Sequence, residues 1–218
     1  CQRLAVIGTK ESVPVLAGLL SDAKLAHYAR YALEPIPDPA VDEALEAALN
    51  KLDGKLLVGA INSVGVRGDA RAVGRLEELM GNADSGVATA AAAALGRIAS
   101  PDAVAALREA LKKAEPLRSA AAAACLVAAD TMLAANKAAD AEALFDAVRK
   151  AEAPQYMHMA ALTGAMRAQG AAAMPLLAEC LKSDNQAEFR VGLQMAHKLG
   201  GPKVAGLVMD LVELPAPV

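Results

Sequence analysis

The chain has 218 residues, of which 55% are apolar and only 2% aromatic, with no Trp, and its formal net charge at pH 7 is −3. Leu, Val, Ile, Met and Ala must therefore fill the interior, and alanine runs at 90–94 and 120–124 have high helix propensity, so we expect an all-α protein with almost no strand. Lysines and arginines are interspersed with acidic residues, which gives no electrostatic footprint for nucleic acid.

The apolar stretches and the cysteines argue against three further kinds of structure. The longest uncharged apolar stretch, 120–129, is about half the roughly 20 residues that a membrane-spanning helix needs, so we expect no membrane span. Cys1, Cys125 and Cys180 are far apart and form no CxxC pair, which indicates neither a zinc site nor a disulfide framework. We expect Cys125 and Cys180 to be buried as small apolar residues.

An apolar pattern that is typical of one helix face recurs along the chain about every 31 residues. In chain order its copies are Val13/Leu16/Leu20, Val41/Leu45/Leu49, Val73/Leu76/Met80, Val104/Leu107/Leu111, a weaker Ala141/Leu144/Val148, Met174/Leu177/Leu181 and Val204/Leu207/Leu211. We name each of these helices an A helix. A repeat of this length predicts an array of stacked helical units.

A second apolar helix, the B helix, follows each A helix after a polar break. Examples of these breaks are Ser21-Asp22, 50–54, 81–86 and 182–185. Several B helices are predicted to end at a glycine in the left-handed conformation, at Val64-Gly65, Leu95-Gly96 and Leu199-Gly200. A turn such as Ser100-Pro101-Asp102 then starts the next A helix, so that each unit is a helical hairpin.

Segments 95–111 (LGRIASPDAVAALREAL) and 63–80 (SVGVRGDARAVGRLEELM) resemble HEAT-like repeats, in the short form also found in phycobilisome lyases. Segments 27–49 and 56–65 resemble HEAT blocks of large, often exported, multidomain bacterial proteins, some of which carry a separate sugar-active domain. The resemblance implies a right-handed α-α superhelix, or solenoid, of about seven hairpins.

Both ends of the chain look like incomplete hairpins. Residues 1–8 are interpreted as the tail of a preceding repeat, and 213–218 as a Pro-rich end or linker. We therefore expect 1–218 to be a single HEAT-like solenoid from a longer bacterial protein, with exposed apolar ends that could drive end-to-end self-association. Another interpretation makes Cys1 the lipid-modified first residue of a lipoprotein. Any export signal would lie upstream, so the compartment is open.

Exposed positions of the B helices are the candidate binding surface if, as the resemblance implies, these helices line the concave side. Counting back from the last apolar residue of each B helix identifies the positions expected to be exposed. Near both ends of the array these positions carry large polar or aromatic residues, and between the ends they carry small residues such as Gly59, Gly86, Ala90 and Ala93. The candidate partner-binding residues are Lys24, His27, Tyr28, Arg30, Tyr31, Lys55, Asn62, Arg190, Gln194 and His197. The small residues allow either close helix approach or a smooth slot for an extended partner.

Tyr28 and Tyr31, beside His27 and Arg30, form an aromatic and polar cluster in a chain with few aromatic residues. Tyrosine and arginine are enriched at binding hot spots. The other interpretation is that both tyrosines wedge between hairpins next to the proline-rich break at 34–37. Asn62 and its neighbour Ser63 could likewise satisfy nearby backbone groups or hold a ligand.

Catalytic motifs are missing from the sequence. Metal-dependent hydroxylases of HEAT architecture use His-Glu pairs, whereas the three histidines are followed by Tyr, Met and Lys, and there is no GxSxG, P-loop, Rossmann glycine pattern or HExxH. We expect no catalytic residue, cofactor or metal site in this segment. The main hypothesis is a non-catalytic interaction or scaffolding solenoid that binds a protein or peptide through its B helices. Alternatives are a rigid spacer that positions a catalytic, for example carbohydrate-active, domain elsewhere in the parent protein, and, more remotely, a HEAT-type lyase acting on a bilin.

Overall fold

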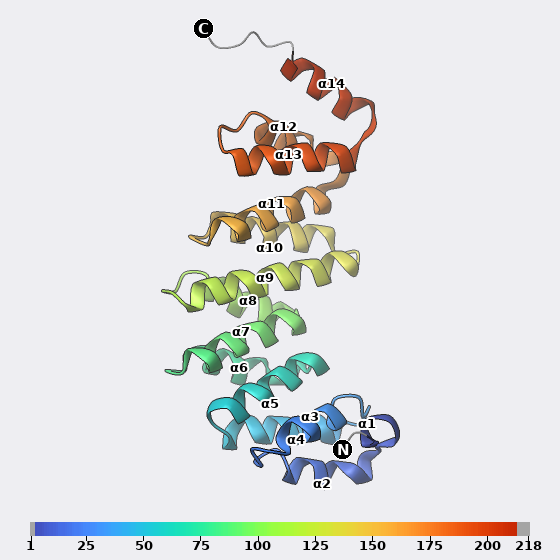
Figure 1. Cartoon of the computed structure of the whole chain (residues 1–218), viewed down its shortest axis with the longest axis vertical. Coiled ribbons are helices and arrows are strands. Elements are labelled where there is room, and N and C mark those ends of the chain that lie inside the picture. Colours follow the sequence, from blue (N-terminus) through green and yellow to red (C-terminus); the bar gives the residue numbers. More distant parts are fainter. Residues whose placement is uncertain (1–2, 213–218) are drawn as a thin grey trace. The chain divides into compact units, whose positions relative to one another are not determined.

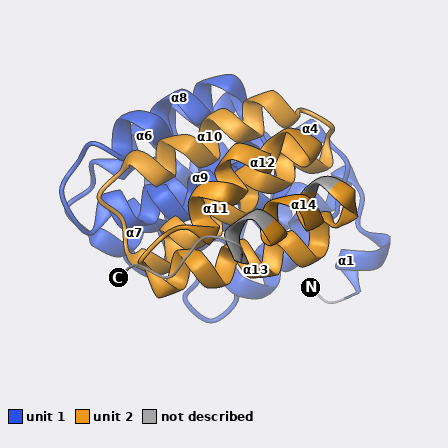
Figure 2. Ribbon diagram, turned by 90° about the horizontal axis from the view of Figure 1, so that it is seen from above, with its two compact units in different colours: residues 1–131 blue, residues 132–218 orange. Residues whose placement is uncertain are grey.

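The computed structural model describes residues 3–212, and within that range it contains helices and no strand (Figure 1). The chain folds into two compact units, residues 1–131 and 132–218 (Figure 2). The expected all-α, hairpin-repeat architecture is confirmed within each unit. Cys1 and the Pro-rich end at 213–218 lie outside the described residues.

Unit 1 begins with a short helix and continues as A and B helices in alternation. After α1 (Leu4–Ile7), the hairpins are α2 (Val13–Gly18) with α3 (Ala26–Leu33), α4 (Pro39–Lys51) with α5 (Gly54–Arg67), α6 (Val73–Met80) with α7 (Ser85–Ile98), and α8 (Pro101–Ala110) with α9 (Leu117–Ala134), whose last turn belongs to unit 2. Short 3-10 turns at Lys10–Ser12 and Ala70–Ala72 lead into α2 and α6. All the predicted A helices of this unit are therefore present.

Unit 2 repeats the same arrangement. Its hairpins are α10 (Ala138–Lys150) with α11 (Gln155–Gln169) and α12 (Met174–Leu181) with α13 (Gln186–Leu199), followed by α14 (Gly201–Val212). A 3-10 turn at Gly170–Ala173 precedes α12. The weak apolar pattern at 141–148 does form an A helix, because its apolar residues are buried against α11.

Polar residues in the turns set where the helices begin. The carboxylates of Asp38 and Asp84 accept hydrogen bonds from the backbone N–H groups of Ala40 (2.9 Å) and Gly86 (2.8 Å). Ser100 accepts from the N–H of Ala103 at 3.2 Å in the same way. Side chains at this position satisfy helix N–H groups that have no partner within the helix. The predicted helix start at Ser100-Pro101-Asp102 is thus confirmed.

The predicted helix end is right at Gly200, which has a positive φ of 57° but, with ψ at −168°, does not have the predicted left-handed helical conformation. The predicted caps at Gly65 and Gly96 are wrong. Helices α5 and α7 continue to Arg67 and Ile98 and end at residues in the left-handed conformation, Gly68 and Ala99. Gly65 and Gly96 are instead buried inside their helices. A Cβ atom on Gly65 would lie 2.9 Å from the Cα of Ala94. A Cβ on Gly96 would lie 2.6 Å from the carbonyl oxygen of Ala124. Their role is to let successive B helices approach closely.

The core consists of aliphatic and alanine side chains, with Phe145 as its large aromatic member. Cys125 and Cys180 are buried, as expected, and burial raises the pKa of their thiols to about 12 and about 11 respectively. Phe145 packs on α11 at Gly164, where a Cβ would lie 2.3 Å from the ring. Close helix packing around small residues therefore characterises both units.

Helix α9 is the one described helix that is long and apolar enough to cross a membrane, with a mean hydropathy of 1.4 over 18 residues. Core helices of globular proteins meet the same criterion. Here one face of α9, including Ala121, Ala124 and Ala128, is buried inside the fold. Of this 18-residue window, 33% is buried inside the described structure.

Candidate functional site

The exposed face of α3 carries the aromatic cluster. Tyr28 and Tyr31 are 46% and 57% exposed, and the ring of His27 meets that of Tyr28 edge-on, with centroids 5.6 Å apart and planes at 67°. Lys24 is exposed in the turn before the helix, where its backbone N–H donates to Asp22. The other face of α3 is buried, so the helix that carries these exposed side chains is held in place by the core.

Arg30, the fifth candidate of this cluster, points into the fold. Its guanidinium donates to the carbonyl oxygen of Gly59 at 2.9 Å and to the Oγ of Ser63 at 3.4 Å. Ser63 in turn donates to the carboxylate of Glu34 at 2.7 Å. Burial lowers the pKa of Arg30, opposed by the negative charge of Glu34. These contacts join α3 to α5, so Arg30 holds the cluster in place.

The two candidates on α5 are polar residues rather than aromatic ones. Lys55 is exposed and Asn62 is half-buried. The prediction that Gly59 and Ala90 are exposed is wrong. Gly59 lies beneath Arg30, whose guanidinium would be 2.7 Å from a Cβ at that position, and Ala90 is buried in α7. Both small residues are therefore covered by the fold rather than open to a partner.

The remaining candidates, Arg190, Gln194 and His197, form a separate exposed face on α13 in unit 2. Phe189 and Leu193 on the same helix are also partly exposed. The structure thus places the ten candidates on two units: the cluster at α3 with Lys55 and Asn62 of α5 in unit 1, and the α13 residues in unit 2.

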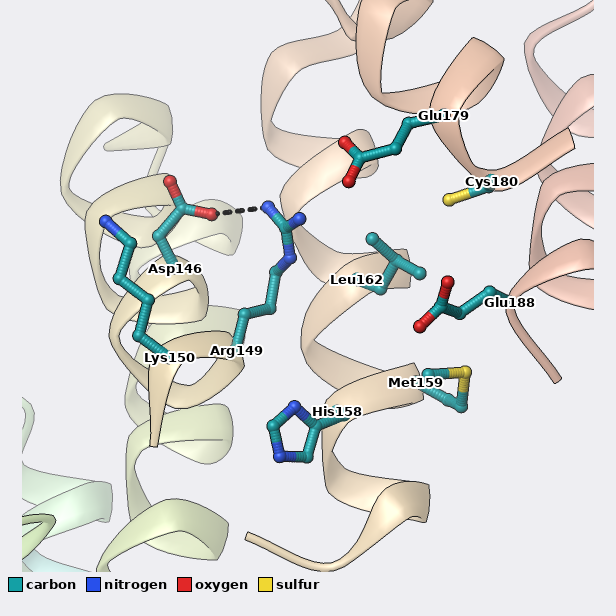
Figure 3. A pocket seen from close by; sticks show the side chains of 9 residues that line it. All are labelled: Asp146, Arg149, Lys150, His158, Met159, Leu162, Glu179, Cys180 and Glu188. Atoms are coloured by element: carbon teal, nitrogen blue, oxygen red, sulfur yellow. Dashed lines mark hydrogen bonds and ion pairs between the residues drawn. The ribbon is translucent and has the colours of Figure 1, made fainter. Parts of the chain in front are cut away.

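Unit 2 also contains a polar pocket of about 250 Å³ among its four hairpin helices (Figure 3). Its lining residues come from α10, α11, α12 and α13 and are Asp146, Arg149, Lys150, His158, Met159, Leu162, Glu179, Cys180 and Glu188. In Figure 3 the α10 side chains form one side, the α11 side chains lie in the middle, and Glu179, Cys180 and Glu188 form the other side. Acidic, basic and apolar groups therefore share one small space.

Several polar groups of the pocket have partners within the protein. Arg149 donates to the carboxylate of Asp146 at 2.8 Å. Glu188 accepts from the Oγ of Ser183 at 2.6 Å. The Nε2 of His158 accepts weakly, at 3.4 Å, from the backbone N–H of Ala153. The side chains of Lys150 and Glu179, both exposed, make no hydrogen bond or ion pair with another described residue.

The thiol in this pocket is not activated. Burial is the main reason that the pKa of Cys180 is raised, and the negative charges of Glu179 and Glu188 act in the same direction. Arg149 opposes the shift only in part. A cysteine nucleophile needs a lowered pKa, so this environment has the opposite effect. In the described part of the chain no three His, Cys, Asp or Glu side chains are grouped so that they could hold a metal ion.

Sequence analysis did not identify this pocket, although the repeat contained a usable signal. When the buried pair Ala161-Leu162 of α11 is aligned with Val191-Gly192 of α13, His158 and Glu188 fall at the same repeat position. Aligning the A helices in the same way matches Asp146 with Glu179. Polar residues at matching positions of adjacent hairpins indicate a shared polar space. The enclosing shape still depends on the packing of four helices.

A family model and one solved structure agree with the hairpin architecture. Residues 41–127 match the family model described as HEAT repeats. The structure of the complex of CpcE and CpcF of phycocyanin lyase from Nostoc sp. PCC7120 is 23% identical, with a TM-score of 0.52, covering 89% of this chain and 79% of that chain. An engineered protein is 20% identical, with a TM-score of 0.45, covering 91% of this chain and 61% of that chain. No curated protein sequence matches the chain.

The likeness to the lyase subunits concerns the fold, since identity at this level does not carry activity. The family match begins two residues inside α4 and covers the rest of the hairpin of α4 with α5, the hairpin of α6 with α7, α8 and part of α9. The chain therefore contains HEAT repeats over residues 41–127 and has the fold of a HEAT-like repeat protein.

Proposed function

We propose that the protein is a non-catalytic interaction module and that the exposed face of α3, comprising Lys24, His27, Tyr28 and Tyr31, is the main part of its partner-binding surface. The observation that carries this proposal is the exposure of both tyrosines, 46% and 57%, on one rigid helix. When a partner buries a tyrosine, a large contact area forms while only a few side-chain torsions lose their freedom.

The packing beneath the tyrosines supports the same conclusion. Ala29, Ala32 and Leu33 are completely buried, and Arg30 fastens the helix to α5. A surface that is already ordered loses little conformational freedom when a partner binds. The charges of the surface indicate the partner's chemistry: Lys24 and the ring N–H of His27 suit a peptide with acidic or carbonyl acceptors beside an apolar anchor.

The proposed lack of catalysis has its own physical support. The thiol in the polar pocket has a pKa of about 11, so that almost none of it is thiolate at neutral pH. The HEAT architecture of residues 41–127 is a scaffold on which many functions occur, and binding along helix faces is typical of such arrays.

Affinity capture with matched variants tests the proposal. The immobilised chain, a Tyr28→Ala/Tyr31→Ala variant and a Tyr156→Ala control are incubated with lysate of the source cells, and the retained proteins are quantified by mass spectrometry. Tyr156 is a suitable control because it is 68% exposed but lies on α11. We expect a protein that is retained by the parent chain and the control and lost from the double variant.

Purified, that protein should bind the parent chain directly, and the double variant at least about tenfold more weakly. Equal capture by all three chains would refute α3 as the binding surface. Retention of nothing specific by any of them would instead favour the rigid spacer, whose function would lie in other domains of the parent protein.

A further inference from the structure

The charges of unit 1 are divided unequally between its two sets of helices. The A helices α4, α6 and α8 contain seven acidic and three basic residues, whereas the B helices α3, α5 and α7 contain four basic residues and no acidic one. Two of the four, Arg30 and Arg67, point into the fold, and the other two, Lys55 and Arg97, are exposed. In Figure 2 the A helices α6 and α8 lie on the opposite side of unit 1 from α7. The B-helix side of unit 1 is therefore the more positive one.

Each of these B helices has an exposed stripe at the same repeat positions. Residues seven and eleven positions apart on a helix lie within about 20° of one line along its surface. Aligning the buried residues Leu33, Val64 and Leu95 brings the three helices into register. In α5 the stripe consists of Lys55, Asn62 and Val66, and in α7 of Gly86, Ala93 and Arg97. On α3 the matching exposed residue is Tyr31, with Lys24 in the preceding turn, so the surface at the tyrosines continues across α5 and α7.

Arg97 lies where the stripes of α7 and α5 meet. Its Cδ is 3.5 Å from the position that a Cβ atom would take on Gly65, so its side chain runs along the contact between the two helices. The side chain is exposed and makes no hydrogen bond or ion pair with another described residue. A guanidinium in this position can donate two parallel hydrogen bonds to a carboxylate of a partner that lies across both helices.

Acidic side chains near the surface limit where a second carboxylate could bind. An aspartate precedes the first position of each stripe by two residues, namely Asp22, Asp53 and Asp84. Asp22 and Asp84 accept from backbone N–H groups, and a carboxylate keeps its negative charge in such a bond. These aspartates weaken the attraction of Lys24 and Lys55 for an anion. The positive charge of the surface is therefore centred on Arg97.

The uncharged residues between the tyrosines and Arg97 favour a protein segment over a nucleic acid. Asn62 and Val66 occupy this stretch, and neither offers a positive charge to a phosphate. Single-stranded nucleic acid needs a row of cations that follows its backbone. The amide of Asn62 can instead bond to a peptide backbone, and Val66, which is 56% exposed, can pack against an aliphatic side chain.

The spacing of the helices sets the length of the segment. Helix α3 packs on α5 and α5 on α7, and packed helices lie about 8–10 Å apart. The distance from the tyrosines to Arg97 is therefore on the order of 20 Å, which about six extended residues span. A segment of this length can place an apolar side chain on the tyrosines and a carboxylate beside Arg97 at the same time.

We infer that the partner-binding surface extends from α3 across α5 to α7 and takes an acidic, extended protein segment of about six residues. A carboxylate of the segment pairs with Arg97, and an apolar side chain packs on Tyr28 and Tyr31. This inference rests on the proposed function, because it uses the same tyrosines. It adds Val66 and Arg97 to the surface and specifies the charge of the partner.

Amide NMR of the full 15N-labelled chain, titrated with three capped peptides, tests the charge of the ligand. The peptides EELEELEE, QQLQQLQQ and KKLKKLKK share their length and leucine positions and differ in charge. We expect EELEELEE to shift amide signals of α3, α5 and α7 saturably, with a dissociation constant on the order of a millimolar, and QQLQQLQQ to bind at least about fivefold more weakly. KKLKKLKK should not bind there. Raising the salt from about 0.01 M to about 0.15 M shortens the screening length from about 30 Å to about 8 Å, which should weaken the binding of EELEELEE alone.

Variants then locate the contacts. Arg97→Gln should weaken the binding of EELEELEE about fivefold and change that of QQLQQLQQ much less. Tyr28→Ala/Tyr31→Ala should weaken the binding of both peptides. Lys182→Gln is the control that should change neither, because Lys182 is also exposed but follows α12 in unit 2. Circular dichroism checks that the variants keep their helices, and the comparison of the three peptides uses the parent chain alone.

Four results would each overturn the inference. They are that EELEELEE binds no more tightly than QQLQQLQQ, that its signal shifts lie outside α3, α5 and α7, that Arg97→Gln binds it like the parent chain, or that an oligothymidylate of the same length shifts the same signals as strongly. The affinity capture judges the proposed function separately. If a captured partner is lost from the tyrosine double variant but kept by Arg97→Gln, the tyrosine surface stands and the acidic segment is refuted. If the double variant also keeps every captured protein, both are refuted.

Discussion

Replacing Gly96 by alanine should destabilise the protein, although alanine is the better helix former. Gly96 lies inside α7, so the substitution by itself gains about 1 kcal/mol of helix propensity. The new Cβ, however, would lie 2.6 Å from the carbonyl oxygen of Ala124 and 2.9 Å from its Cα. Both are backbone atoms of α9, so relief requires α7 and α9 to move apart.

The expected magnitude follows from these opposing effects. Overpacking of a tight interface costs about 1–3 kcal/mol, and contact with backbone favours the upper part of that range. We expect a net loss of about 1–2 kcal/mol in the free energy of unfolding for Gly96→Ala. Gly74→Ala is the matched control, because Gly74 is also helical, in α6, and nothing lies within 4 Å of its added Cβ. It should gain up to about 1 kcal/mol.

Thermal and urea unfolding followed by circular dichroism measures the difference. The gap of about 2–3 kcal/mol between the two variants corresponds to a difference of about 5–10 °C in Tm for a chain of this size. Combining Gly96→Ala with Ala124→Gly should restore only part of the loss, since the oxygen and Cα of residue 124 remain. If Gly96→Ala were as stable as Gly74→Ala, close approach would not be the reason for this glycine.

Two further predictions concern buried polar groups. Arg67→Met should lower the free energy of unfolding, measured with urea, by about 3 kcal/mol, because this guanidinium is only 12% exposed, donates to backbone carbonyls of the loop between α3 and α4 and pairs with Asp42. Arg71→Met, at a control position that is 53% exposed, should lower it by less than about 1 kcal/mol. Equal losses for the two variants would contradict this account. In a chain in which Cys1 is replaced by serine, Cys125 and Cys180 should react slowly with iodoacetamide at pH 8. Burial raises the pKa values of their thiols to about 12 and about 11, so that at most about one thiol in a thousand is ionised at this pH. Labelling should accelerate on denaturation or as the pH approaches 11, and rapid labelling of the folded chain at pH 8 would refute the stated burial.

The hairpin order could be predicted because it depends on local information. Apolar spacing marks the A helices, and residues such as Ser100 act on N–H groups within three residues of themselves. The weak pattern at 141–148 was placed correctly for the same reason. Secondary structure in this chain is thus determined mostly within each hairpin.

The roles of Gly65, Gly96 and Arg30 could not be predicted, because they depend on neighbouring hairpins. A glycine before a turn resembles a helix cap, and only the position of Ala94 or Ala124 in the next B helix reveals the close approach. The sequence around Arg30 predicts an exposed binding residue, whereas its guanidinium donates to the carbonyl oxygen of Gly59 on α5. The polar pocket needs side chains from four helices, which no single sequence segment specifies.

Photo-crosslinking in the source cells tests the central claim, that α3 contacts a protein partner, most directly. Benzoylphenylalanine is substituted at Tyr28 in one chain and at Tyr156 in another, since both positions are exposed but lie on helices of different units. The account predicts a discrete crosslinked protein with the group at position 28 and none with the group at position 156. A crosslink of the same protein from position 156 alone, or no crosslink from position 28 when that partner is co-expressed, would contradict it.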